Sequence, residues 1–143
     1  MTAALAITPA VAASLSRWHA MIASRDLSGV AALARPDVIF RSPAMHKAYH
    51  TAPVLALILG TVIQVFEDFT YHREFASEDG LSVVLEFSAR VGDRELKGID
   101  MIRFDAEGRI AEFEVMIRPL SGLQALAAEM GARIGAQLAG APA

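Results

Sequence analysis

Three tight-turn signals divide residues 65–118 into four segments of strand length, and this pattern constrains the fold more than any other feature. The signals are Ser77–Gly80, Gly92-Asp93 and Asp105–Gly108. Glycine beside an acidic residue supplies the positive φ that a hairpin turn requires. Between the turns, apolar and polar residues alternate, as in strands with one buried face. We therefore predict a meander of antiparallel strands, over Val65 to about Phe75, Leu81–Val91, Glu95–Phe104 and Arg109–Arg118.

Helical patterns surround this meander. Two of them begin at Thr8-Pro9 and Thr51–Pro53, where Thr can cap free N–H groups and Pro has its φ already set for a helix. The elements expected here are a helix from Pro9, a short helix Ser28–Leu33, a strand Asp37–Ser42, a helix from Thr51 to about Val62 and a last helix Leu120–Leu138. Helices followed by a run of strands predict an α+β fold, with helices covering one face of a curved sheet.

Length and composition limit the classes of protein that fit. The 143 residues predict a single domain, 1–143, in which residues 1–7 form a loose tail. A net charge of −3 without a basic cluster argues against a nucleic-acid surface. The longest uncharged run, 48–66, is too polar to span a membrane. The start of the chain lacks the basic residues of a secretory signal, so we expect a cytoplasmic protein.

Cysteine is absent, which excludes disulfides, zinc-thiolate sites and thiol nucleophiles. A metal site would have to use His46, His50 and His72. Their spacing matches no familiar ligand pattern, so we predict neither a metal nor another cofactor.

Four segments resemble the NTF2-like superfamily and, within it, the SnoaL-like proteins. They are Trp18, Pro36–Pro43, Gly98–Ile110 and Ile117–Pro119, and the resemblance spans about positions 14 to 120. It implies a cone of curved sheet and helices around one deep pocket, usually in a homodimer. The same fold hosts isomerases, dehydratases, cyclases, epoxide hydrolases and binders without catalytic activity, so it does not choose among them.

Ketosteroid isomerase is the sharpest comparison within that superfamily, and it is an established case of pKa tuning. That enzyme needs an Asp base before the Pro that follows the first strand, a Tyr on the first helix and a protonated Asp on the penultimate strand. Asp100 matches the last of these. Ser42 stands at the base position and Trp18 at the Tyr position. Only one of the three parts is present, so the ketosteroid isomerase mechanism is not expected to carry over to this chain.

Asp100 is the main candidate for chemistry. It shares its predicted strand face with Leu96, Gly98, Ile102 and Phe104. Apolar surroundings raise the pKa of a carboxyl group, which would make Asp100 a hydrogen-bond donor or general acid. The alternative is a structural carboxylate whose hydrogen bonds are satisfied by Trp18 or a water molecule.

The loop before the second long helix supplies further candidates. His46 or Tyr49 could act as a second catalytic group beside Asp100, because His can transfer protons near neutral pH. The alternative is that this loop, with His50, is simply solvated. The residues expected to line the pocket are Trp18, Phe40, Ser42, Val83, Leu85, Phe87, Phe113 and Val115.

Two functions remain open at this point. The first is a cofactor-independent isomerase, cyclase or hydrolase that applies acid/base chemistry to a small, largely apolar molecule, for example a cyclic one. The second is a ligand-binding or dimeric scaffold protein without catalysis. Val84, Met101 and Met116 alternate with the core residues of their strands and would otherwise face water, so we predict a homodimer through that sheet face.

Overall fold

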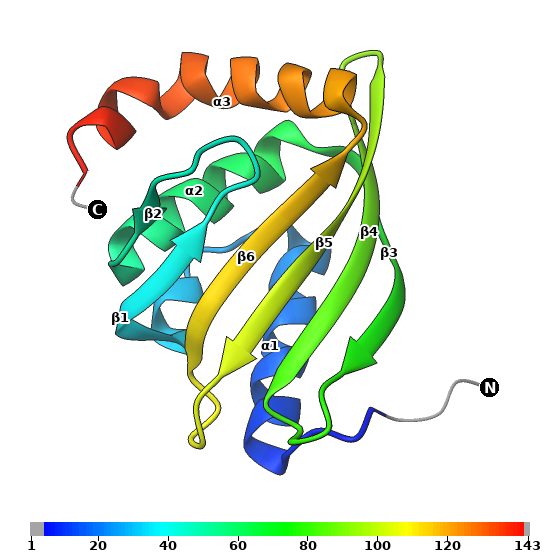
Figure 1. Cartoon of the computed structure of the whole chain (residues 1–143), viewed down its shortest axis with the longest axis vertical. Helices are drawn as coiled ribbons and strands as arrows, with labels where there is room; N and C mark the ends of the chain where they lie inside the picture. The colour runs from blue at the N-terminus through cyan, green and yellow to red at the C-terminus, as the bar shows by residue number, and fades with distance from the viewer. Residues whose placement is uncertain (1–4, 142–143) are drawn as a thin grey trace.

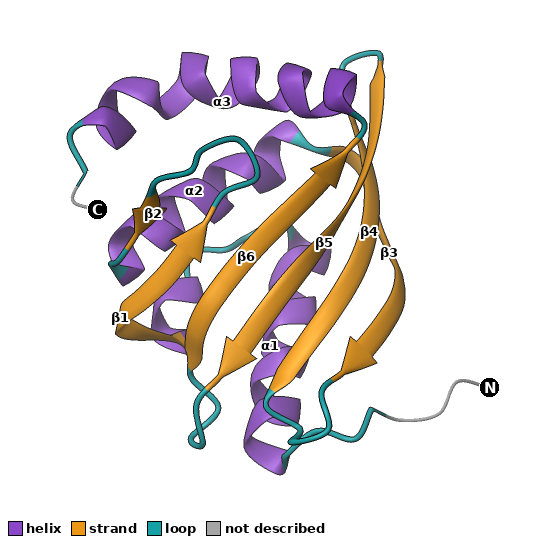
Figure 2. Cartoon of the chain, in the orientation of Figure 1, coloured by secondary structure: helices purple, strands orange, loops and turns teal. Residues whose placement is uncertain are grey.

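A curved sheet carries helices on one face, with its other face open (Figures 1 and 2). The computed structural model describes residues 5–141. The helices are α1 (Pro9–Ser24), the 3-10 helix η1 (Val30–Leu33), α2 (Ala52–Val65) and α3 (Leu120–Ala139). The strands are β1 (Ala34–Arg41), β2 (Ala48–Tyr49), β3 (Glu67–Ala76), β4 (Ser82–Val91), β5 (Arg94–Phe104) and β6 (Ile110–Arg118). This is the predicted α+β fold.

The strand order in the sheet is β2-β1-β6-β5-β4-β3. Strands β3 to β6 form the predicted antiparallel meander, while β1 pairs with β6 in parallel. The three turns of the meander contain Gly80, Gly92 and Gly108, all at positive φ. The helix starts are also as predicted, because the hydroxyls of Thr8 and Thr51 each accept a hydrogen bond from the backbone N–H three residues later.

The first strand begins at Ala34, so the prediction that it starts at Asp37 was wrong. The short strand β2 pairs only with Phe40 and Arg41, and the pairing with β6 is irregular between Ala34 and Ile39. Pro36 therefore lies in a stretch of β1 without regular strand pairing, where its lack of a backbone N–H removes no ladder hydrogen bond. The predicted loop between Ala44 and His50 also contains β2.

A bulge in β3 changes the facing of its second half. Tyr71 pairs with Phe87 but Glu74 pairs with Leu85, so β3 has one extra residue between them. Simple alternation predicted Phe69, Tyr71, Arg73 and Phe75 on one face. Instead, Phe75 is 52% exposed and Arg73 bonds Glu86 of the outer face. An unpaired residue shifts every side chain after it to the opposite face.

The core lies between the inner face of the sheet and the helices. Helix α1 contributes Val11, Leu15 and Trp18, and the Trp18 ring meets Phe113 edge-on at 5.3 Å. Helix α2 is apolar around most of its surface and is largely buried, as predicted. No helix in residues 5–141 is long and apolar enough to cross a membrane.

Candidate ligand-binding and catalytic site

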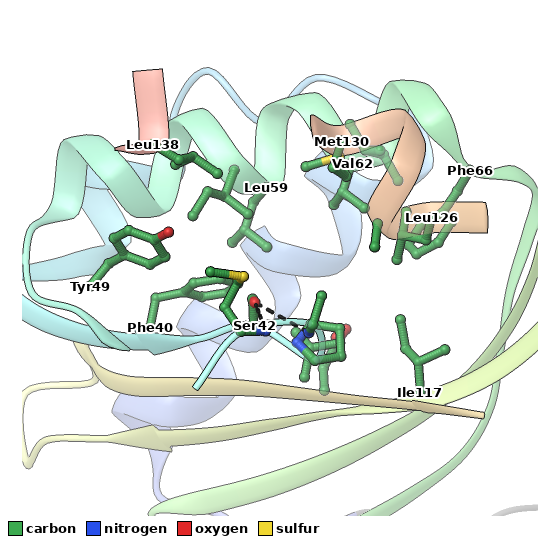
Figure 3. Close-up of a pocket in the computed structure, with 18 of the residues that line it drawn as sticks. Phe40, Ser42, Tyr49, Leu59, Val62, Phe66, Ile117, Leu126, Met130 and Leu138 are labelled. Atoms are coloured by element: carbon green, nitrogen blue, oxygen red, sulfur yellow. Dashed lines mark hydrogen bonds between the residues drawn. The ribbon is translucent and has the colours of Figure 1, made fainter. Parts of the chain in front are cut away.

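A cavity of about 380 Å³ lies between the inner face of the sheet and helices α2 and α3 (Figure 3). Its walls are mostly apolar. They come from α2 and α3 (including Leu59, Val62, Leu126, Met130 and Leu138) and from the strands (including Phe40, Phe87, Val115 and Ile117). The polar side chains that border it are Ser42, Lys47, Tyr49 and Asp100. Such a space suits a small, largely apolar molecule that makes few polar contacts.

Asp100 is a buried acid in this apolar wall. It lies on β5 between Leu85 of β4 and Val115 of β6, and it is only 5% exposed. Loss of hydration penalises the charged form, and burial raises the pKa of Asp100 to about 7 even though a hydrogen bond from Tyr71 acts to lower it. Near neutral pH, both forms of the carboxyl group are therefore available.

A chain of two hydrogen bonds holds Asp100 from the side of β3 and α1. The Tyr71 hydroxyl donates to Asp100 Oδ2 at 2.6 Å, and Trp18 Nε1 donates to the Tyr71 oxygen at 3.0 Å. An indole N–H can only donate. Its bond to the Tyr71 oxygen therefore directs the Tyr71 proton toward Asp100. Burial, followed by the charge of Asp100, raises the pKa of Tyr71 well above its ordinary value, so Tyr71 stays protonated.

The second carboxyl oxygen of Asp100, Oδ1, is left for the cavity. Within residues 5–141, Oδ1 has no hydrogen-bond partner. Every side-chain oxygen or nitrogen that is fully buried in this range does have a partner, so Oδ1 cannot be fully buried. Oδ1 therefore borders accessible space, and Asp100 is part of the cavity wall. Because Oδ2 accepts from Tyr71, a proton on Asp100 belongs on Oδ1, from which it can be donated to a ligand.

Three polar residues lie beyond the end of β1 and on β2. Ser42 Oγ accepts hydrogen bonds from the backbone N–H groups of Ala44 and Met45, so it stabilises its own loop. Lys47 Nζ donates to the carbonyl oxygen of Ala141 at 2.9 Å and lies 5.1 Å from the centre of the Tyr49 ring. Tyr49 is buried beside Phe40, with its hydroxyl pointing toward the cavity (Figure 3).

The comparisons with known proteins agree with this architecture. Residues 15–113 match the family model of the SnoaL-like domain, which is more than half of the chain. The chain belongs to the SnoaL-like family. No curated protein sequence matches this SnoaL-like protein.

Several solved structures are similar to this SnoaL-like protein. A steroid delta-isomerase from Pseudomonas aeruginosa is 63% identical, with 95% of this chain and 99% of that chain covered and a TM-score of 0.91. An uncharacterised protein with a cystatin-like fold from Silicibacter pomeroyi is 34% identical over 85% of each chain, with a TM-score of 0.79. An epoxide hydrolase/cyclase-like enzyme of salinomycin biosynthesis is only 12% identical, at a TM-score of 0.63, and shares the fold alone.

The structure brings most of the sequence-predicted site residues of this SnoaL-like protein to one cavity. Those that border it are Trp18, Phe40, Ser42, Tyr49, Phe87, Asp100 and Val115. Val83, Leu85 and Phe113 were expected there too, but they lie in the closed core and do not border the cavity. Phe113 does not border the cavity because the Trp18 ring of α1 packs against it.

The loop histidines stay outside the cavity. His46 and His50 are exposed, and His46 does not border the cavity. His72 lies on the outer face of the sheet, where its ring Nε2 shares a 2.7 Å hydrogen bond with Ser88. In the part of the chain that the structure describes, no three His, Cys, Asp or Glu side chains gather as metal ligands.

Sequence reasoning missed Tyr71 as a partner of Asp100 and proposed Trp18 instead. The structure places Trp18 one hydrogen bond further away, behind Tyr71. The pairing of Tyr71 with Asp100 crosses strand β4, so it depends on a register that the sequence does not display. Lys47 was missed as well, because it reads as an ordinary surface residue in a loop.

Proposed function

We propose that this protein binds a small, mostly apolar ketone in the cavity and isomerises it with Asp100 as hydrogen-bond donor to the ketone oxygen. One observation carries the proposal. Asp100 is a buried acid with a pKa of about 7, held through Oδ2 by Tyr71, and its Oδ1 is open to the cavity. A fixed donor in an apolar site stabilises negative charge far better than a donor in water does.

The chemical step follows from this geometry. Protonated Asp100 donates from Oδ1 to the carbonyl oxygen of the ligand. When a neighbouring C–H bond breaks, its proton passes to a water molecule and its electron pair forms the enolate, whose negative oxygen the Asp100 hydrogen bond stabilises. The ligand must therefore carry a carbon–carbon double bond one carbon away from conjugation with the carbonyl group. Return of the proton from water to the far carbon of that double bond then gives the conjugated ketone and completes the isomerisation. No oxidant, reductant or metal is needed for this sequence.

The similarity to a steroid delta-isomerase suggests a first substrate to test. A steroid ketone with its double bond one carbon away from conjugation would be converted to the conjugated isomer, which absorbs in the ultraviolet. Replacing Asp100 with Leu removes the donor, and we expect kcat/KM to fall by about 100-fold or more. Replacing the exposed His46 with Ala, outside the cavity, should leave kcat/KM unchanged.

A second function, binding without catalysis, is favoured by a specific observation. Asp100 is the only carboxylate among the described residues that border the cavity, and no histidine borders it. The described residues around the cavity therefore offer no evident base for removing the proton from carbon. If the ketone binds through Asp100 but is not converted, this second function replaces the first.

We also propose that the outer face of the sheet pairs with a second copy of the chain. Phe75, Met101 and Met116 are 52%, 37% and 43% exposed on this face. Phe75 and Met101 also border a groove of about 430 Å³, together with Val84, Arg103 and Glu114. Because this groove carries both a basic and an acidic side chain next to its apolar residues, two copies related by a twofold axis can complement each other.

A further inference from the structure

We propose that the cavity contains a second polar subsite, formed by Tyr49 and Lys47, that binds a carboxylate at the end of the ligand farthest from Asp100. This inference rests on the proposed function for the oxygen held by Asp100. The ligand class is then a small apolar ring system with an oxygen at one end and a carboxylate at the other.

Tyr49 provides the first observation. The residue is only 3% exposed, and its hydroxyl has no hydrogen-bond partner within residues 5–141. No fully buried side-chain nitrogen or oxygen in that range lacks a partner, so the hydroxyl must border accessible space. Figure 3 shows it turned toward the cavity, near Leu59 and Leu138. A hydroxyl that faces such a space keeps both its donor hydrogen and its acceptor lone pairs for a ligand.

Lys47 provides the second observation. Lys47 lines the same cavity, and its ammonium group lies over the Tyr49 ring, 5.1 Å from the ring centre, and donates a hydrogen bond to the backbone carbonyl of Ala141. Among residues 5–141, no acidic side chain forms an ion pair with Lys47. An ammonium group has three donor hydrogens, so it keeps capacity for an anion. Its positive charge makes a carboxylate a better occupant than a neutral oxygen.

The two polar ends of the cavity are well separated. Tyr49 lies on β2 and Asp100 on β5, and β1 and β6 lie between these strands. Neighbouring strands are about 4.8 Å apart, so the two backbones are separated by roughly 14 Å, less the effect of curvature. Apolar residues such as Phe40 and Val115 border the cavity between them. One polar group of a ligand cannot serve both ends, whereas a rigid molecule with a polar group at each end can.

The test compares two fluorescent probes with the purified protein at about pH 6, where Asp100 is mostly protonated. One is a naphthol. The other is a hydroxynaphthoic acid with its hydroxyl and carboxylate at opposite ends of the ring system. We expect the wild-type protein to bind the hydroxynaphthoate about 10-fold or more tightly than the naphthol, since a hydrogen bond to a charged group is worth more than one to a neutral group.

Two substitutions locate the subsite. Tyr49→Phe removes only the hydroxyl, and Lys47→Met removes the charge. Each should reduce the preference for the hydroxynaphthoate by about 10-fold while leaving naphthol affinity unchanged. Lys97→Met is the matched control, because Lys97 pairs with Glu86 on the outer face of the sheet. It removes the same charge away from the cavity and should leave the preference intact.

Equal binding of the two probes by the wild-type protein would overturn the inference, as would an equal loss of both in Tyr49→Phe. A different result would contradict the proposed function, namely that the Asp100→Leu variant binds the naphthol as tightly as the wild-type protein does. The carboxylate preference and its sensitivity to Tyr49 are thus measured separately from the role of Asp100.

Discussion

The hydroxyl group of Tyr71 donates a 2.6 Å hydrogen bond to Oδ2 of Asp100, across the intervening strand β4. This contact leaves the second carboxyl oxygen of Asp100 facing the cavity. It also stabilises the charged form of an acid whose burial favours the neutral form. The balance of these two effects places the pKa of Asp100 in the physiological range, where the group can both hold and release a proton.

The first prediction concerns Tyr71→Phe. Removing the hydroxyl takes away the hydrogen bond that lowers the pKa of Asp100, so that pKa should rise above about 7. A carbon-detected NMR titration of the Asp100 carboxyl would measure it. The variant should also lose about 1–3 kcal/mol of unfolding free energy, because the buried Trp18 N–H is left without its acceptor.

Trp18→Phe is the companion variant. It leaves the bond between Tyr71 and Asp100 in place but removes the indole that directs the Tyr71 proton, so a smaller rise of the Asp100 pKa is expected. An Asp100 pKa that falls in Tyr71→Phe would show that Tyr71 does not stabilise the carboxylate.

The second prediction is a pH dependence of stability. The pKa of Asp100 is about 7 when folded and ordinarily 3.8, so between these values the folded chain keeps a proton that the unfolded chain has released. The stability that Asp100 contributes is complete below about pH 4 and is lost as the pH rises through about 7. The total change is about 4 kcal/mol, at about 1.4 kcal/mol per pKa unit.

Asp100→Asn isolates this effect, because the amide fits the same space and does not titrate. Relative to the wild-type protein, the variant should gain several kcal/mol of unfolding free energy between about pH 4 and about pH 9. Urea unfolding at both pH values measures the difference. A constant difference between the two proteins would mean that Asp100 has an ordinary pKa in the folded state.

The third prediction concerns the helix that roofs the cavity. At Gly122 of α3, an added Cβ would lie 2.7 Å from the carbonyl oxygen of Glu95 and 2.8 Å from Leu96 Cβ, both on β5. Gly122→Ala must therefore push α3 away from the sheet, at a cost of about 1–3 kcal/mol. Because Leu126 and Met130 on α3 border the cavity, naphthol binding should weaken as well.

Gly60→Ala on α2 is the control for Gly122→Ala. An added Cβ at Gly60 meets nothing within 4 Å, so the substitution should stabilise α2 by about 1 kcal/mol through helix propensity. Thermal unfolding of the two variants would show opposite shifts. If the unfolding temperatures of both variants shift in the same direction, Gly122 is not needed for the close packing of α3 against β5.

The fourth prediction tests the proposed pairing of two copies. Met101→Lys places a charge in the outer-face groove. In sedimentation at micromolar concentration we expect the wild-type protein to be a dimer and this variant to be a monomer. Met45→Lys, at a position that is 56% exposed at the cavity, should leave the dimer intact. A wild-type protein that sediments as a monomer would refute the pairing directly.

The features that the sequence determined by itself are local ones. Thr8 and Thr51 cap helices, and Gly80, Gly92 and Gly108 turn the strands, because each acts on backbone groups a few residues away. The inward facing of Asp100 also follows from alternation along a regular strand, since β5 pairs with β4 without interruption.

The tertiary structure decided what those inward residues meet. The bulge after Tyr71 sends Phe75 to the outer face, and the register of three strands brings Tyr71 to Asp100. The packing of α1 closes over Phe113, whereas α2 and α3 leave a space beside Tyr49. These outcomes depend on contacts between segments far apart in the chain, and no periodicity within one segment encodes them. The sequence therefore determined that an acid would be buried on this sheet, and only the folded packing decided which oxygen of that acid faces the cavity.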